Sequence, residues 1–191
     1  MWTAAHDHVP SGKGESIMGL FALFGRKKES GEKTDDKVVY SPVKGEVIRL
    51  EDVEDEAFAS GAMGPGIGIR PLEGMVCAPV SGQVCAIFPT GHAVGIRRED
   101  GVEVLLHIGI DTVNMKGDGF DVKVGEGALV RVGDPLVKVD LDKVQTAGYQ
   151  TTIMLLITNA SAIGGELADI HVGPVEARGP IFSYTSGGPW V

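Results

Sequence analysis

Residues 102–111 read VEVLLHIGID, and this stretch decides the fold. Successive side chains of a β-strand point to opposite faces, so every second residue lies on the same face. One face carries only apolar side chains, namely Val102, Val104, Leu106, Ile108 and Ile110. The alternation therefore predicts a strand that packs this face on the core. The other face carries His107 between Leu105 and Gly109, so we expect the imidazole to point away from the core, with open space beside Gly109.

A second histidine is predicted to lie close to this strand. His92 opens another strand-like run, which extends to Arg97. The clear turn signal between the two runs is EDG at residues 99–101. A hairpin that closes at this turn makes the strands antiparallel and brings His92 near His107. The pattern predicts two neighbouring histidines at the open end of a hairpin.

The rest of the chain indicates many short strands. It has 191 residues, 28 of them glycine, and its apolar runs are bounded by glycine or proline. PVKGEV at residues 42–47 recurs as PVSGQV at residues 79–84. Two such units facing each other predict an all-β fold, an antiparallel β-sandwich or a partly closed barrel. Short helical turns are expected at 52–60 and 140–147, each of which starts at an aspartate and ends before a glycine.

The chain divides by composition. We expect an unstructured extension at 1–17 and an amphipathic segment at 18–28 that can contact a membrane surface weakly, with a disordered tail as the equal alternative for the latter. A charged linker follows at 29–37, then one folded domain at 38–175 and a loose tail at 176–191. The absence of a secretory signal and of a long apolar run predicts a cytoplasmic protein, with any membrane contact at the inner face.

Charge and cysteine content narrow the partners. The formal net charge is −9, which argues against nucleic acid and favours a basic protein partner. Cys77 and Cys85 lie in apolar runs, so they are expected to be buried thiols in a reducing compartment.

A histidine pair suits phosphoryl transfer. A neutral imidazole is a good nucleophile near neutral pH, and a second imidazole can donate to phosphoryl oxygens. On the residues alone, two ordinary surface histidines are an equal alternative.

Several motifs resemble a known family. They are TGHA at 90–93, LLHIGIDT at 105–112, GDGF at 117–120, SPVKG at 41–45, GPGIGIRP at 64–71 and APVSG at 78–82. Over about residues 38–172 the chain resembles the glucose-type enzyme IIA family of the bacterial sugar phosphotransferase system. Leu105 and Val94 stand where enteric members have phenylalanine, and Glu54 and Pro65 also depart from the pattern. These departures bear on regulatory partners rather than on the reaction.

The resemblance implies roles for the histidines and for two neighbours. His107 would accept phosphate on its outer nitrogen from the histidine phosphocarrier protein and pass it to a cysteine of a IIB domain. His92 would stabilise the phosphoryl group. Thr90 would orient His92, and the Gly109 carbonyl would hold the inner nitrogen of His107. The chain would thus be a phosphotransferase component with a phosphohistidine intermediate and no required cofactor, and the sugar cannot be identified from the sequence.

The resemblance also implies a partner-binding surface. Its residues would be the apolar Phe58, Met63, Phe88 and Leu105, with the carboxylates Asp55 and Asp111. The same surface would serve a regulatory role, in which the chain binds permeases or kinases.

Two other functions compete with this one. A zinc-binding β-rich hydrolase needs three or more ligands, whereas His92 and His107 supply two and would need a partner's ligand to hold zinc. A lipoyl- or biotinyl-type carrier needs an exposed lysine at a hairpin tip, and Lys116 is the nearest approach.

Overall fold

The computed structural model describes residues 36–187, which form short strands and five short helical segments. The predictions for 1–17 and 18–28 and most of the predicted linker at 29–37 lie outside the described residues. Within residues 36–187, no helix is both long enough and apolar enough to cross a bilayer.

All strand pairs are antiparallel and belong to three sheets. The large sheet has the order β13 (Gly173–Val175), β2 (Gly45–Arg49), β3 (Gly66–Pro71), β11 (Ile153–Ile157), β7 (Glu103–Ile108), β6 (Ala93–Arg97), β5 (Gly82–Ile87) and β9 (Leu129–Val130). One small sheet has the order β1 (Val38–Tyr40), β14 (Pro180–Thr185) and β12 (Glu166–Ala168), and the other has β4 (Met75–Cys77), β10 (Pro135–Val139) and β8 (Phe120–Val122).

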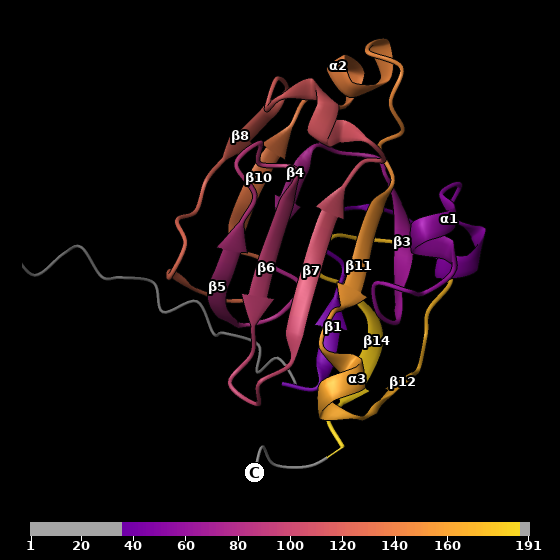
Figure 1. The fold of residues 1–191 in the computed structure, drawn as a ribbon, viewed down its shortest axis with the longest axis vertical. Helices are drawn as coiled ribbons and strands as arrows, with labels where there is room; N and C mark the ends of the chain where they lie inside the picture. Colours follow the sequence, from indigo (N-terminus) through magenta and orange to yellow (C-terminus); the bar gives the residue numbers. More distant parts are fainter. Residues whose placement is uncertain (1–35, 188–191) are drawn as a thin grey trace, which may run out of the picture. The chain divides into compact units, whose positions relative to one another are not determined.

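The small sheets lie behind the large one, which makes two layers (Figure 1). The strand order of the large sheet ends at β13 and β9, so this sheet does not close on itself. The predicted all-β antiparallel sandwich is confirmed, and the strands of residues 36–187 form no closed barrel.

The helical segments are short. They are η1 (Leu50–Asp52), α1 (Glu56–Ala59), η2 (Thr112–Met115), α2 (Leu141–Thr146) and α3 (Ala160–Ile163). The two predicted turns, at 52–60 and 140–147, are present, although the helix of the first, α1, is capped by Asp55 and not by Asp52. Asp55 caps α1 by accepting from the Phe58 N–H at 3.1 Å, and Asp140 caps α2 by accepting from the Lys143 N–H at 3.0 Å. Each carboxylate satisfies a backbone donor that the short helix itself cannot pair.

The central strands bury both of their faces. Val104, Leu106 and Ile108 of β7 are buried in the main core between the sheets, as the alternation predicts. The opposite face carries a second cluster, which η1 and α1 help to form together with neighbouring strands. Its buried members are Ile48, Val53, Phe58, Ile110, Met154 and Leu156. This second cluster makes the histidine face of the sheet far less open than the alternation predicts.

Ile110 does not continue the core face, so that part of the prediction is wrong. Strand β7 ends at Ile108, and Gly109 has a φ of +79°, a left-handed conformation that breaks the alternation. Ile110 consequently packs in the second cluster.

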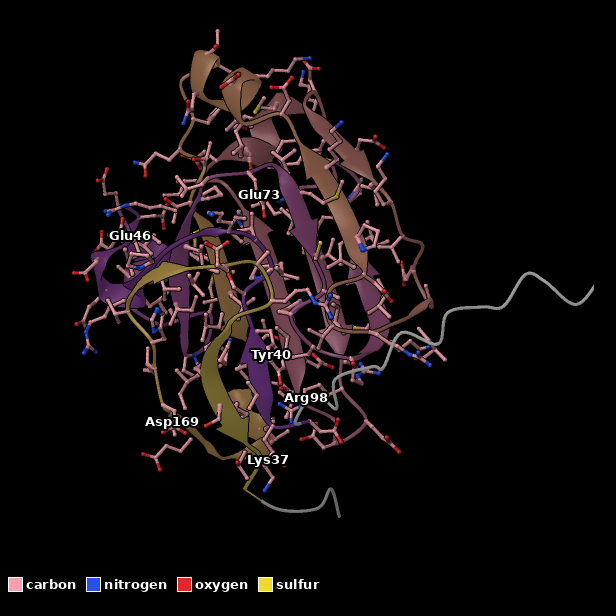
Figure 2. The ribbon with its side chains drawn as sticks, turned by 180° about the vertical axis from the view of Figure 1, so that it is seen from behind. Lys37, Tyr40, Glu46, Glu73, Arg98 and Asp169 are labelled. Atoms are coloured by element: carbon pink, nitrogen blue, oxygen red, sulfur yellow. The ribbon has the colours of Figure 1, made fainter. Side chains whose placement is uncertain are left out.

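The predicted hairpin is present. Strands β6 and β7 pair with Ala93 opposite His107 and Arg97 opposite Glu103. Beyond Arg97 lies the buried Arg98 (Figure 2). Its guanidinium forms two hydrogen bonds with the Asp100 carboxylate, at 2.6 and 3.1 Å, and donates to the Tyr184 carbonyl of β14 at 3.4 Å. The far end of the hairpin is thereby tied to the layer behind it.

The repeated motif marks two equivalent strand pairs. A Cβ added to Gly45 would lie 2.3 Å from the Arg70 carbonyl oxygen, and one added to Gly82 would lie 2.3 Å from that of Arg97. Both glycines therefore let a neighbouring strand approach closely. The two pairs, β2–β3 and β5–β6, lie in one sheet with β11 and β7 between them, and both contribute side chains to the main core.

The prediction of a loose tail at 176–191 is also wrong over the described residues. Strand β14 pairs with β1 on one side and β12 on the other. Ile181, Phe182 and Tyr184 are buried in the main core. The folded domain thus extends beyond residue 175. The apolar residues of β14 make it the middle strand of its sheet even though glycines flank it.

The close approach at Gly82 predicts a measurable cost of substitution. Gly82→Ala should lower the free energy of unfolding by about 2 kcal/mol, because the new methyl would overlap backbone that cannot move aside. Gly125→Ala is the matched control, since nothing lies within 4 Å of its added Cβ, and it should change stability by less than about 0.5 kcal/mol. Urea unfolding of both variants tests this, and equal effects would contradict it.

Candidate functional site

His92 and His107 form a pair of adjacent imidazoles. Their ring centroids are 4.9 Å apart and the ring planes meet at 81°. His107 lies on β7, while His92 directly precedes β6, and the Ile108 N–H donates to the His92 carbonyl at 2.7 Å. The sequence-based expectation that the hairpin brings the two residues together agrees with this geometry.

One ring nitrogen of His107 is held by the backbone. Nδ1 lies 3.0 Å from the carbonyl oxygen of Gly109. A carbonyl can only accept a hydrogen bond, so the neutral ring must carry its proton on Nδ1. Nε2 is then left with a free electron pair, which is the state that a nucleophile requires.

The His92 ring is oriented by Thr90. The Thr90 hydroxyl is in hydrogen-bond contact with Nδ1 of His92. When the hydroxyl donates, Nδ1 is the acceptor and the proton of the neutral ring lies on Nε2. His92 can then act as a donor toward a group on His107, and the two rings carry complementary tautomers.

Burial keeps both rings neutral at physiological pH. The pKa of His107 is lowered to about 4, chiefly by loss of solvation and also by the neighbouring His92. The Gly109 hydrogen bond and the carboxylates of Asp55 and Asp111 act in the opposite direction on this pKa, but they are weaker. Burial also lowers the pKa of His92. An uncharged imidazole retains the electron pair that protonation would remove.

The pair is more enclosed than the sequence suggests. His92 is only 5% exposed and His107 is half-buried. The ring of Phe58 lies 4.9 Å from that of His107, and the ring of Phe88 lies 5.5 Å from that of His92. Each histidine is therefore packed against an aromatic ring, which limits how it can turn.

Gly109 has a different physical role from the one expected. A Cβ added there would lie 2.3 Å from the Thr112 methyl carbon and 2.8 Å from the Gln150 carbonyl oxygen. The expectation of open space at Gly109 is therefore wrong. Glycine is needed here because of the positive φ and the close packing, and both serve to aim its carbonyl at His107.

The predicted partner-binding residues occupy three kinds of position. Met63 and Phe88 are well exposed, at 40% and 44%. Leu105 is half-buried and packs on the second cluster, whereas Phe58 is buried and supports the His107 ring instead of offering a surface. Asp55 caps α1 and Asp111 is exposed, and both are near enough to act on the His107 pKa.

Two neighbours of His107 were not foreseen. Met154 of β11 and Ala93 of β6 lie directly opposite His107 in the two adjoining strands, and both are fully buried. Met154 belongs to an apolar run with no mark of a site, since only the register between β7 and β11 places it there.

The residues described here offer no complete metal site. Across 36–187, no group of three or more His, Cys, Asp or Glu side chains could hold a metal ion. The histidine pair supplies two nitrogens, so a further ligand would have to come from outside this part of the chain. A zinc hydrolase that binds its metal without a partner would need a third ligand, and residues 36–187 do not provide one beside the pair.

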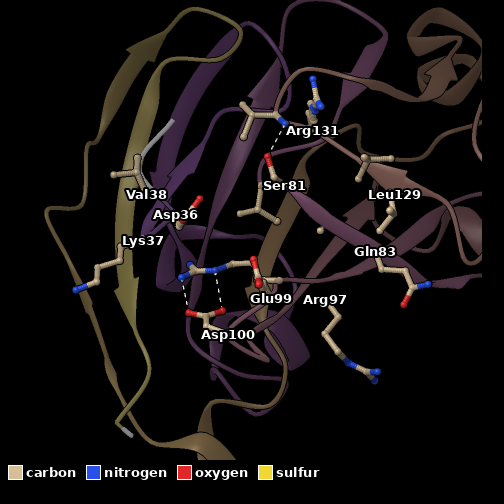
Figure 3. Close-up of a pocket in the computed structure, with 15 residues that line it drawn as sticks. Asp36, Lys37, Val38, Ser81, Gln83, Arg97, Glu99, Asp100, Leu129 and Arg131 are labelled. Carbon is tan, nitrogen blue, oxygen red and sulfur yellow. Dashed lines mark hydrogen bonds and ion pairs between the residues drawn. The ribbon is translucent and has the colours of Figure 1, made fainter. Parts of the chain in front are cut away.

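Other candidate residues lie apart from the pair. Lys116 ends η2 rather than standing at a hairpin tip, which is unfavourable to the carrier hypothesis. Cys77 and Cys85 are free and half-buried, and burial raises the pKa of both thiols. A cavity of about 940 Å³ lies at the far end of β6, between Arg97, Leu129 and Val38, and neither histidine lines it (Figure 3).

Comparisons with known proteins agree on one family. A family model described as phosphoenolpyruvate-dependent sugar phosphotransferase system, EIIA 1, matches residues 37–163. A relative from Staphylococcus epidermidis named PTS system glucose-specific EIIA component is 40% identical over 155 residues, which cover 81% of this chain and 89% of the relative. A relative of the same name from Halalkalibacterium halodurans is 44% identical over 140 residues, covering 73% and 81%. The solved structure of glucose permease IIA from Mycoplasma capricolum matches with a TM-score of 0.70 and 35% identity, over 78% of this chain and 96% of that chain.

The lowered pKa of His107 predicts a pH-dependent part of the stability. Between the unfolded value of about 6.5 and the folded value of about 4, the unfolded chain binds a proton that the folded chain does not. Stability should therefore fall as the pH falls through this window, by up to about 3 kcal/mol from His107 alone.

Urea unfolding at pH 7 and pH 4 measures this loss. The variant His107→Gln has no group at this position that titrates. Its free energy of unfolding should therefore fall by less between pH 7 and pH 4 than that of the wild type. Equal losses in the two proteins would contradict the lowered pKa.

Proposed function

Because the chain belongs to the EIIA 1 family of the phosphoenolpyruvate-dependent sugar phosphotransferase system, we propose that it carries a phosphoryl group on Nε2 of His107. The group would come from the histidine phosphocarrier protein and pass to a cysteine of a IIB domain, which couples transfer to sugar uptake. The names of the relatives make the glucose permease the first IIB partner to test.

The observation that carries this proposal is the hydrogen bond between Nδ1 of His107 and the Gly109 carbonyl. With Nδ1–H held by Gly109, the electron pair of Nε2 is free to attack phosphorus. A new N–P bond forms as the donor's N–P bond breaks, and the electron pair of the broken bond remains on the donor's imidazole. No proton has to leave His107 during attack, and the Gly109 carbonyl stabilises the positive charge that develops on the ring.

His92 supplies the complementary donor. Its Nε2–H would donate to a phosphoryl oxygen on His107, while Thr90 holds the other nitrogen. Positioning and charge stabilisation account for most of the catalysis in phosphoryl transfer. His92 therefore should matter most when the group moves on to the next carrier.

The chemistry requires no cofactor. A zinc ion bound to the pair would use the same Nε2 electron pair of His107 that accepts the phosphoryl group. We propose that zinc would bind only with a ligand from a partner, and that such binding would compete with phosphorylation.

The surface around the pair suits protein partners. Phe88 exposes apolar area beside His92, and Met63 exposes apolar area shortly after α1 in the chain. Asp55 and Asp111 add negative charge near His107. An apolar centre with a charged border is typical of protein interfaces, where charge sets encounter and register. Regulatory binding of permeases or kinases would use the same surface.

Labelling with phosphoenolpyruvate, enzyme I and the histidine phosphocarrier tests the proposed acceptor. The wild type should gain one acid-labile phosphate, and His107→Ala should gain none. His92→Gln should still accept the group but pass it to IIB at least 100-fold more slowly, roughly the value of one positioned donor. His171→Ala is the matched control, because His171 is exposed and its ring contacts the Pro174 carbonyl, at 2.9 Å, instead of either histidine of the pair. Label on His107→Ala would exclude the proposal.

Steady-state transfer from the histidine phosphocarrier tests the proposed surface. Met63→Ser should raise KM about tenfold with little change in kcat, because Met63 is exposed and would contribute only a contact made on binding. Leu129→Ser is the control, since Leu129 is 83% exposed on the far edge strand β9, and its KM should not change. An unchanged KM for Met63→Ser would place the docking surface elsewhere.

A further inference from the structure

We propose that Thr112 is a positioning residue for His107, acting through Gly109. The proposal rests on the proposed function, because it concerns the state of the nitrogen that accepts the phosphoryl group. It is carried by the contacts of the buried Thr112 side chain with Ile108 and Gly109.

Both polar groups of the peptide that joins Gly109 to Ile110 are hydrogen-bonded. The Ile110 N–H donates to the Gln150 carbonyl at 3.1 Å, while the Gly109 carbonyl accepts from Nδ1 of His107 at 3.0 Å. A trans peptide is planar, so its N–H and C=O point in opposite directions. Any rotation of this peptide would weaken both hydrogen bonds at once.

Thr112 closes the turn that contains this peptide. Its side chain is fully buried, and its hydroxyl donates to the Ile108 carbonyl at 2.6 Å. Its methyl packs so closely on Gly109 that an added Cβ there would lie only 2.3 Å from it. The hydroxyl thus fixes the residue before Gly109, and the methyl fixes Gly109 itself.

The contacts link Thr112 to the chemistry of His107. If the Gly109 carbonyl turned away, nothing in the described contacts would keep the proton on Nδ1. The ring could then carry its proton on Nε2, and that nitrogen would have no free electron pair for phosphorus. Thr112 therefore sets the fraction of His107 that is ready to react.

A second buried hydroxyl provides a matched control. Ser41 is 1% exposed, and its hydroxyl donates to the Val43 carbonyl at 2.6 Å, the same length as the Thr112 bond. Ser41 lies after β1 and has no contact with the histidine pair among those described. Ser41→Ala removes a comparable hydrogen bond without altering the Gly109 peptide.

The experiment compares Thr112→Val, Thr112→Ser and Ser41→Ala in the full chain. Nitrogen-15 NMR of the imidazoles reports the tautomer of His107 without any phosphoryl donor. Transfer from the phosphorylated histidine phosphocarrier reports the rate, and urea unfolding reports stability. The three readouts separate positioning from folding.

We expect the wild type to show a single Nδ1–H tautomer. Thr112→Val should add the Nε2–H tautomer and accept the phosphoryl group about tenfold more slowly. Thr112→Ser, which keeps the hydroxyl, should retain most of the Nδ1–H tautomer and most of the wild-type rate. Ser41→Ala should lose stability but keep the tautomer, with a rate within about twofold of the wild type. If Thr112→Val does not fold, Thr112→Ala set against Thr112→Ser isolates the hydroxyl in the same way.

Two results would overturn the proposal. One is a Thr112→Val protein that is less stable yet keeps the wild-type tautomer and rate. The other is a Ser41→Ala protein that slows as much as Thr112→Val, which would indicate general softening of the fold. A wild type with the expected tautomer that accepts no phosphoryl group would refute the proposed function but leave the positioning by Thr112 intact.

Discussion

The hydrogen bond from Nδ1 of His107 to the Gly109 carbonyl is the interaction on which the proposed chemistry depends. It selects one tautomer of a neutral ring and leaves Nε2 as the only nucleophilic nitrogen. A histidine on a flexible loop would exchange between tautomers and orientations. Here the acceptor is a backbone carbonyl at the end of a central strand, and the same turn that ends β7 directs that carbonyl back to the side chain.

The proposed chemistry also requires an uncharged His107, and burial on both faces of the sheet provides this. The inner face of β7 packs in the main core, and its outer face is bordered by a second cluster that includes Phe58. The enclosed ring of His107 loses solvation, which lowers its pKa and keeps it uncharged. A more exposed pair would be easier to reach but would be partly protonated near pH 6.5. The enclosure is thus a compromise between access and reactivity.

The scaffold is rigid for reasons that lie away from the pair. Two equivalent strand pairs flank the central strands β7 and β11, and each contains a glycine that lets the neighbouring backbone approach. Arg98 ties the far end of the histidine hairpin to β14, whose own side chains fill the main core. A shift of any one strand would require movement in both layers, so the positions of His92 and His107 are set by the whole sandwich.

Sequence alone determined the local elements. The alternation of β7, the β6–β7 hairpin and the cap at Asp140 all follow from patterns a few residues long. The resemblance of the motifs to a family pointed to His92, His107, Thr90 and the Gly109 carbonyl. The tertiary structure decided the rest, including the left-handed turn at Gly109, the change of side at Ile110, the burial of Phe58 and the pairing of β14. Each of these depends on contacts between residues far apart in the chain, and hydrophobic periodicity within one strand contains no information about which distant strand, helix or methyl group will cover it.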